Sequence, residues 1–236
     1  MAKSFLLMGE PSTGKSTSLR TLDYKETFII TPNVKDFPFP GAEVNYTNYD
    51  SKTGKGNVYR TEELDNISAI IKHVSSKLPH VKQIVLEDFS HYLTHRVLGP
   101  DFAGDTGYNK WNRLGASVQA ALFTGLDKLR DDLIILIIHH TDLHEDGKVK
   151  EQTAGKLMDN LIKVSSWYTV ILHSHIKLEK DVRRYVFQTN EVAPFLAKSP
   201  PGMFADMYIS NNMQKVLDDM RLYRAGKPQY PVHFID

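Results

Sequence analysis

Hydrophobic and polar residues follow two periods along the chain, and each period predicts one kind of element. Unbroken apolar runs predict strands buried on both faces. These runs span 4–8, 27–31, 81–86, 133–138, 167–172 and 185–188, and a further edge strand is expected at 44–49. Apolar residues three and four positions apart predict helices. Those helices span 16–24, 61–78, 111–130, 154–164 and 214–224.

The order of these elements predicts the fold class. Strands that alternate with helices form βαβ units, which build a parallel sheet. We therefore expect an α/β fold with a mostly parallel sheet and helices on both faces. The length of 236 residues fits one domain over 1–236. The Gly-rich stretch 99–107 predicts a mobile loop, and 142–150 predicts a charged irregular segment.

Composition excludes several classes of protein. The chain has 29 basic and 28 acidic side chains and no cysteine. A net charge of +1 creates no overall attraction to nucleic acid or membrane, so such contacts need a local patch. Without cysteine there are no disulfides, thiolate metal sites or cysteine nucleophiles. The longest apolar run, 133–138, is far shorter than the ~20 residues that span a bilayer, and 5–8 is too short for a signal peptide. We expect a cytoplasmic protein without membrane contact.

One motif, between the first strand and the first helix, carries specific chemistry. Residues 9–16 read GEPSTGKS and match the phosphate-loop pattern G-x-x-x-x-G-K-[ST]. Backbone N–H groups of such a loop surround a phosphate, Lys15 reaches the β- and γ-phosphate oxygens, and Ser16 offers a hydroxyl to Mg²⁺. A chance match is expected in roughly one chain of this length per hundred. The predicted nucleotide-binding residues are Gly9, Glu10, Pro11, Ser12, Thr13, Gly14, Lys15, Ser16 and Thr17.

Two carboxylates follow the third buried strand. The segment 84–88 reads IVLED, so Glu87 and Asp88 stand where this strand ends. An acid at this position holds the water shell of the magnesium ion in P-loop proteins. A carboxylate at a strand end can instead cap the element or face solvent. Together with the phosphate loop, the magnesium role is the better interpretation.

An ordered set of segments resembles a known family over nearly the whole chain. These segments are GEPSTGKSTSLRTL, ETFII followed by FPF, IVLEDFSHYL, GYNKWNRLG, LRDDLIILIIHH, a GK before LMDN, VFQTN and AKSPPGMF. The set is similar to the phage RecA-like ATPases grouped with single-strand-annealing proteins, the fourth Sak-type group. The resemblance implies a RecA-like core, ATP as the nucleotide, self-assembly into a ring or filament, and annealing or recombination of single-stranded DNA. A single-stranded-DNA-binding protein is a further expected partner, and a phage-encoded chain would act in the host cytoplasm.

The resemblance also divides the roles of the two acids. The Asp88-Phe89 step is similar to the Asp-aromatic step of RecA-like helicases, which assigns magnesium to Asp88 beside Ser16. Glu87 then orients or deprotonates the attacking water. RecA recombinases carry a catalytic glutamate after their second strand, but 29–33 reads IITPN and contains no acid. Hydrolysis is therefore slow or uses Glu87, and ATP then serves more as an assembly ligand than as fuel.

Two further roles are implied by the resemblance. In a RecA-like core the strand that here runs into His140 carries a polar residue that senses the γ-phosphate. A hydrogen-bonded histidine at the sheet edge is the alternative, and a zinc site with the later H-x-H at 173–175 lacks a carboxylate at suitable spacing. Lys198 lies in the segment AKSPPG and matches a lysine or arginine near the end of RecA-like cores. That residue reaches the γ-phosphate bound by the neighbouring subunit, and Lys156 is the runner-up for this role. An ordinary surface lysine is the alternative.

Contact with single-stranded DNA is expected at two places. Aromatic and basic residues adjoin the Gly-rich loop, where rings can stack on bases and cations can meet phosphates. These residues are Tyr108, Lys110, Trp111 and Arg113. The segment after the sensor strand adds Lys148, Lys150 and Lys156. The alternatives are that Trp111 anchors its helix in the core and that the lysines are solvated.

Two other functions use the same phosphate loop. A small-molecule kinase usually closes an arginine-rich lid over the phosphates, and the charged segment 142–150 contains no arginine. A nucleotide-gated assembly module with little turnover is the third alternative. The ATPase that assembles on single-stranded DNA is the function we predict from the sequence.

Overall fold

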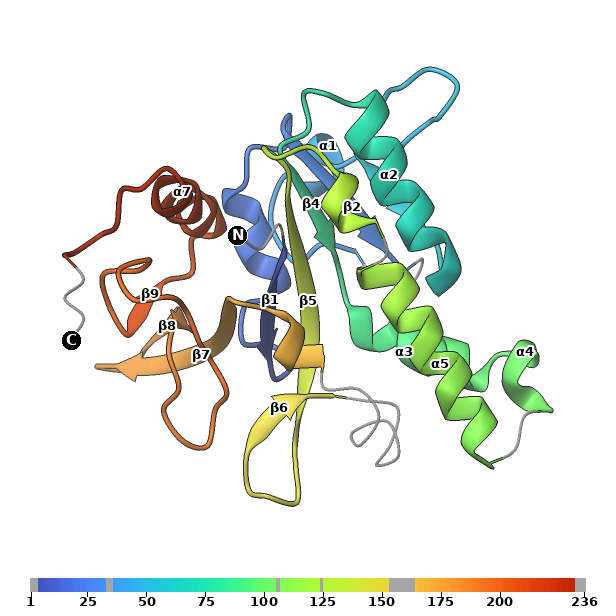
Figure 1. Cartoon of the computed structure of the whole chain (residues 1–236). Coiled ribbons are helices and arrows are strands. Elements are labelled where there is room, and N and C mark those ends of the chain that lie inside the picture. Colours follow the sequence, from blue (N-terminus) through green and yellow to red (C-terminus); the bar gives the residue numbers. More distant parts are fainter. Residues whose placement is uncertain (1–3, 33–35, 105–106, 124, 153–163, 232–236) are drawn as a thin grey trace.

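The computed structural model describes residues 4–32, 36–104, 107–123, 125–152 and 164–231. Within these residues one sheet of nine strands runs through the molecule (Figure 1). The strands are β1 Ser4–Gly9, β2 Thr27–Thr31, β3 Val58–Arg60, β4 Gln83–Leu86, β5 Ile134–Leu143, β6 Val149–Glu151, β7 Ile171–Glu179, β8 Val182–Gln188 and β9 Tyr208–Ser210. The α-helices are α1 Ala42–Asn45, α2 Ile67–Lys77, α3 Phe89–Leu98, α4 Pro100–Ala103, α5 Gly107–Leu122 and α7 Met213–Arg224. Short 3-10 helices span Ser16–Thr21, Leu64–Asn66, Leu126–Lys128 and Val164–Trp167.

The strand order is β3-β2-β4-β5-β1-β7-β8-β9, with β6 paired to β5. Neighbouring strands from β3 to β7 are parallel, whereas β8 pairs antiparallel with both β7 and β9. All six residues of β1 are buried, as expected for a central strand covered on both faces. The predicted α/β fold with a mostly parallel sheet is therefore confirmed.

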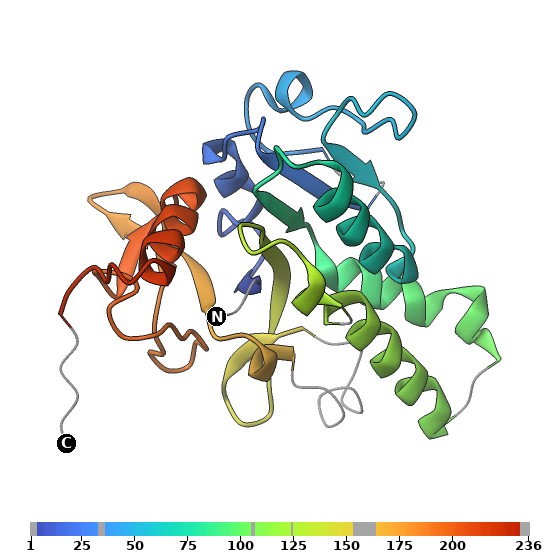
Figure 2. The same ribbon diagram turned by 45° about the horizontal axis from the view of Figure 1, so that its top comes forward.

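Both faces of the sheet are packed, because alternate residues of each strand point to opposite sides. Leu6 and Met8 of β1 join a core beneath α2, α3 and α5. Phe5 and Leu7 join a second core, where the helix Ser16–Thr21 and α7 cover the sheet. Figures 1 and 2 show α7 on one side of β1 and α2 and α5 on the other. The predicted helices on both faces are confirmed.

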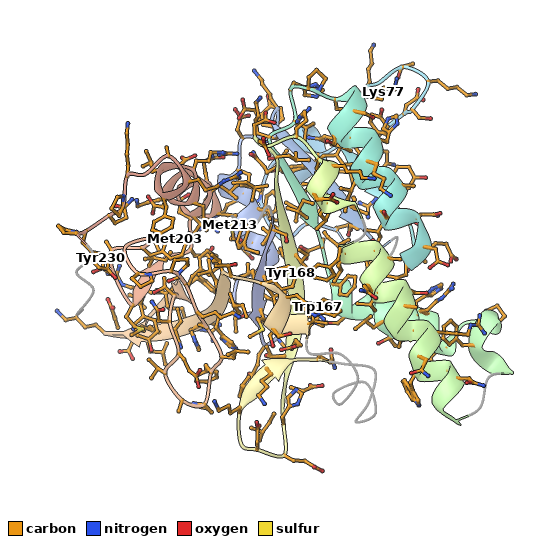
Figure 3. The ribbon with its side chains drawn as sticks, in the orientation of Figure 1. Lys77, Trp167, Tyr168, Met203, Met213 and Tyr230 are labelled. Carbon is orange, nitrogen blue, oxygen red and sulfur yellow. The ribbon has the colours of Figure 1, made fainter. Side chains whose placement is uncertain are left out.

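Methionines and aromatic rings close the ends of these cores. Met203 and Met213 are buried in the second core, between α7 and the sheet (Figure 3). On the first face the ring of Trp167 meets Phe123 edge-on with centroids 4.3 Å apart, and Tyr168 is buried beside them. These contacts fix the segment that leads into β7.

Two predicted irregularities and one predicted strand are corrected by the structure. The edge strand expected at 44–49 is reduced to one parallel bridge between Asn48 and Val58 of β3, because Gly41 adopts a left-handed conformation with φ of 78° and begins the short helix α1. The outer strand of this end is β3, which was not predicted. The segment 142–150 is irregular only at 144–148, because its two ends complete β5 and begin β6 in an antiparallel hairpin. The loop expected at 99–107 contains α4.

Other elements differ in extent or type. The helix expected from 16 is a 3-10 helix that stops at Thr21. The strand expected at 167–172 starts at Ile171, because Val164–Trp167 forms a 3-10 turn first. Helix α3 directly after the two acids was not predicted, and the helix expected at 154–164 lies almost wholly outside the described residues.

Candidate active site

The sheet collects the predicted site residues at one edge. The carboxyl ends of parallel strands meet at the same edge of a sheet, and ligands bind there in open α/β folds. Gly9 ends β1, Glu87 follows β4, and His140 lies opposite Gly9 on β5. The phosphate loop, both acids and the predicted sensor thus come together, although Gly9 and His140 are 131 positions apart in the sequence.

The phosphate loop turns sharply between β1 and the helix Ser16–Thr21. Ser12 has φ of 65° and Gly14 has φ of 92°, both in the left-handed region. A Cβ at Gly14 would lie 2.7 Å from Cδ1 of the Tyr185 ring, so this position also has no room for a side chain. The sequence signal for glycine therefore has two causes, the backbone angle and the close approach of Tyr185.

Lys15 lies inside the loop. Its Nζ donates to the carbonyl oxygens of Gly9 at 2.7 Å and Glu10 at 2.8 Å. The side chain is only 5% exposed, which is unusual for lysine and places a fixed positive charge in the hollow of the loop. The Lys15 ammonium therefore lies where it would neutralise the negative charge of bound phosphate oxygens.

Ser16 and Glu87 are in contact. The Ser16 hydroxyl donates to Glu87 Oε1, and Glu87 is held in place because its N–H donates to the Ile30 carbonyl at 2.9 Å. A hydroxyl and a carboxylate are the hard oxygen donors that Mg²⁺ prefers, so this pair fits the ion. It is Glu87, and not Asp88, that the structure brings to Ser16.

Asp88 turns in the other direction. It adopts a left-handed conformation with φ of 52°, unusual for a residue other than glycine, asparagine or aspartate, and it begins α3. Its Oδ1 lies 3.5 Å from Nε2 of His140, whose Nδ1 lies 3.5 Å from Nζ of Lys15. The three side chains form a chain from the phosphate loop to the second acid.

His139 faces the core behind the site. Its Nδ1 lies 2.7 Å from the Ser90 hydroxyl, which also accepts from the His140 N–H at 2.9 Å. Burial lowers the pKa of His139 to about 4, so this ring is neutral near pH 7. Ser90, in the first turn of α3, thereby fixes the backbone on which His140 is carried.

Residues far along the chain hold the phosphate loop from its other side. The Ser174 hydroxyl of β7 lies 2.6 Å from that of Thr13, and Asn211 Nδ2 donates to the Gly14 carbonyl at 3.0 Å. Arg20 in turn donates to Asn211 Oδ1 at 2.8 Å. Sequence reasoning missed Ser174, Asn211 and Tyr185, and no local motif marks them.

The residues predicted to contact DNA on α5 are spread along its first turns. Trp111 is half-buried and packs against the first core. The Arg113 guanidinium lies over the Phe102 ring of α4 at 4.8 Å, and Lys110 Nζ lies 6.0 Å from the Trp111 ring centroid. The side chain of Tyr108 lies outside the described residues. The contact of Trp111 with DNA stays a prediction.

The second predicted DNA segment forms the β5–β6 hairpin. Lys148 pairs with Glu191 at 2.8 Å and Lys150 pairs with Asp146. The hairpin is tied to the chain near residue 194, because the Val149 N–H donates to the Pro194 carbonyl at 2.8 Å. Lys156 lies outside the described residues. The contact of these lysines with DNA remains a prediction.

Lys198 lies away from the phosphate loop of its own chain. Its backbone exchanges two hydrogen bonds with Ile171, of 2.8 and 2.9 Å. Ile171 is opposite Leu6, three residues before Gly9, so the two positions are roughly 10 Å apart along the strands. The side chain is half-buried. Its predicted action on a neighbouring subunit stays a prediction.

Comparisons with known proteins add little to this geometry. No family model matches the chain, and no curated protein matches it. Among solved structures, the chain is similar to a KaiC-like protein from the hyperthermophilic archaeon Pyrococcus horikoshii. The two share 10% sequence identity with a TM-score of 0.41, over 84% of this chain and 81% of that one. A likeness at this level carries no information on activity or partners.

Two features of the described residues concern membrane contact and metal binding. No helix there has the length and apolar character that a membrane span needs. No three His, Cys, Asp or Glu side chains in the same residues gather as a metal-binding group. A magnesium ion at a phosphate loop needs no such group, because it keeps several waters and takes phosphate oxygens as ligands.

Proposed function

We propose that this protein is a Mg²⁺-dependent ATPase that assembles on single-stranded DNA. The observation that carries the ATPase is the contact of Ser16 with Glu87 beside the buried ammonium of Lys15. A cation, a hydroxyl and a carboxylate in this arrangement form a complete phosphate and magnesium site. The phosphate loop alone binds nucleotides of several kinds, and the contact with Glu87 supports a magnesium ion beside the nucleotide.

The geometry favours an exchange of roles between the two acids. Glu87 and Ser16 would hold the ion, which when bound neutralises charge on the phosphate oxygens. Asp88, linked through His140 to Lys15, is then the candidate to orient the attacking water near the γ-phosphate. This assignment follows the contact made by Ser16 instead of the Asp-aromatic resemblance.

The DNA part of the proposal rests on the sequence resemblance and on the side chains available. Lys110, Trp111 and Arg113 offer a ring and two cations within about one turn of α5. Such a combination binds unpaired strands by stacking and by phosphate contacts, with little sequence preference. Assembly into a ring or filament and annealing of strands belong to the same proposal.

One set of rate measurements tests the proposal against its alternatives. ATP hydrolysis by the full chain is measured with Mg²⁺ alone, with single-stranded DNA, and with a panel of hydroxyl-bearing metabolites. We expect stimulation by single-stranded DNA. Transfer of phosphate to a metabolite would establish a kinase instead. Nucleotide binding without turnover under any condition would establish an assembly module.

A further inference from the structure

Strands β7 and β8 continue as a two-stranded ribbon beyond the rest of the sheet. β1 pairs with β7 only up to His173, and β9 pairs with β8 only from Val186 onward. Among the described strands, the ribbon between these points therefore has no other neighbour. Figure 1 shows it projecting at the end of the sheet away from β2 and α2.

One face of this ribbon is apolar and carries one cation. Ile176 lies opposite Tyr185 and Leu178 lies opposite Arg183, so these four side chains share a face, here called the ribbon face. Leu178 is 72% exposed. Arg183 is exposed and has no ion pair with any described residue. Single exposed apolar residues are common, but a row of them beside an unpaired arginine is a candidate interface.

The ribbon face is continuous with the candidate active site. Tyr185 lies against Gly14 of the phosphate loop, and Ser174, two residues before Ile176, contacts Thr13. A partner bound on the ribbon face would therefore contact an element that also holds the loop. Binding there and nucleotide binding would affect one another.

A cavity with complementary character lies after β2. It has a volume of about 350 Å³, and its lining contains three aromatic rings, two acids and one cation, Arg60. We call it the aromatic pocket; its lining used here is Asp36, Phe37, Phe39, Glu43, Val44 and Tyr46. The three ring centroids are 5.5 to 5.9 Å apart. Among described residues neither acid has an ion-pair partner.

The two surfaces cannot meet within one chain. β2 and β7 are separated by β4, β5 and β1, which makes four strand spacings and roughly 19 Å. A contact between them must join two copies through different surfaces. Such a heterologous contact repeats from copy to copy and builds a ring or an open filament.

We propose that the ribbon face of one copy docks into the aromatic pocket of a second copy of this chain. Leu178 enters among the phenylalanine rings, and Arg183 faces Asp36 and Glu43. Apolar burial then supplies the affinity, and the opposite charges set the orientation of the two copies. The inference rests on the self-assembly within the proposed function and names the surfaces that assemble.

The first test measures assembly of the full chain by sedimentation velocity, with ATP and Mg²⁺. Leu178→Asp on the ribbon and Val44→Asp at the pocket rim should each weaken assembly at least about tenfold, because each places a charge in an apolar contact. Leu98→Asp is the matched control, since Leu98 is 78% exposed and lies outside both surfaces. ATP affinity, measured by calorimetry at a protein concentration where wild type is monomeric, should be unchanged in all three variants.

A charge exchange provides the second test. Arg183→Glu should weaken assembly about tenfold, and the added substitution Glu43→Arg should restore most of it, because the pair is then reversed. Absence of rescue together with normal assembly of Leu178→Asp would overturn the docking proposal. If Val44→Asp weakens ATP binding but not assembly, the pocket serves the nucleotide and the proposal is wrong. Wild-type protein that stays monomeric while it hydrolyses ATP overturns the docking and the proposed assembly but leaves the proposed ATPase intact, whereas protein that binds no ATP overturns the proposed ATPase.

Discussion

At the scale of single residues, His140 stands between a cation and an anion. Lys15 has only donors, so the His140 nitrogen that faces it, Nδ1, accepts. The proton of the ring then belongs on Nε2, which faces Asp88. A phosphate that draws Lys15 away from this ring would change the contact between His140 and Asp88. The site therefore has a physical route by which nucleotide binding alters the second acid.

Lys15→Ala should lower ATP affinity by roughly 10- to 100-fold, because a charge-assisted contact to phosphate is lost. Calorimetry measures the affinity, and thermal melting checks that the fold persists. Lys55→Ala is the matched control, since Lys55 is exposed and belongs to a TGKG segment that lacks the Ser or Thr of a phosphate loop. Equal affinities of Lys15→Ala and wild type would remove the phosphate-loop assignment.

Glu87→Gln and Asp88→Asn should fail in different ways. Glu87 contacts Ser16, so its neutral variant should need about tenfold more Mg²⁺ for half-maximal ATP hydrolysis. Asp88→Asn should keep the Mg²⁺ requirement and lower kcat by roughly 100-fold, the size expected when a general base is removed. The ATP hydrolysis rate of each variant, measured over a range of Mg²⁺ concentrations, distinguishes the two roles. The opposite pattern would show that Asp88 is the magnesium ligand, as the sequence resemblance implies.

At the scale of elements, three neighbouring strands place two buried histidines on either side of β1. Met8 lies opposite His139 on β5 and His173 on β7. Burial lowers the pKa of His139 to about 4 and that of His173 to about 3. No described residue hydrogen-bonds either ring nitrogen of His173. The strands thus bury neutral rings directly behind the phosphate loop.

This arrangement predicts acid sensitivity. An unfolded histidine takes up a proton near pH 6.5, but these two rings resist protonation until about pH 4 and pH 3. The unfolded state therefore binds more protons below pH 6.5, so stability falls as the pH is lowered through this window, by at most about 1.4 kcal/mol per pH unit for each ring. The free energy of unfolding, measured with denaturant at several pH values between 6.5 and 4, should fall less steeply with decreasing pH in His173→Phe than in wild type. His80→Asn, an exposed position, should keep the wild-type slope.

Helix α5 carries the prediction for DNA. Trp111→Ala should weaken binding to single-stranded DNA by roughly 10-fold, the loss of about one stacked base. Trp167→Ala is the matched control, because that ring packs on Phe123 outside α5. Fluorescence anisotropy at two salt concentrations measures both affinities, which should fall with salt in wild type. A large drop in melting temperature with unchanged DNA affinity would show that Trp111 serves the core alone.

At the scale of the whole molecule, Lys198 tests whether one copy completes the site of another. Lys198→Ala should bind ATP normally but lose hydrolysis and nucleotide-dependent assembly, since a cation supplied by a neighbour acts only in the assembled state. Mixing it with Lys15→Ala should restore part of the ATPase rate, because one copy then supplies the phosphate loop and the other the lysine. A mixture that forms hetero-assemblies yet stays inactive would show that Lys198 has no role in trans.

The features that could be predicted from the sequence are the motifs and elements that depend only on residues close together in the chain. The phosphate loop, the buried strands and the acids that follow β4 were predicted, because apolar runs and Gly-Lys-Ser spacing are local properties. Elements whose form depends on packing against distant parts of the chain could not be predicted in this way. The segment at 44–49 has the composition of a strand, but the buried ring of Tyr46, whose hydroxyl donates to the Leu19 carbonyl, fixes it on the phosphate-loop helix instead.

Tertiary structure alone decided which side chains surround the phosphate loop. Parallel pairing set β7 beside β1 and so brought Ser174 to Thr13, 161 residues earlier. The same pairing brought Glu87, directly after β4, to Ser16, and the left-handed backbone of Asp88 turned the second carboxylate in another direction. Successive side chains of a strand face opposite directions, and their register is set by long-range pairing. Sequence spacing determines which functional side chains are available, and strand register determines which of these side chains come into contact.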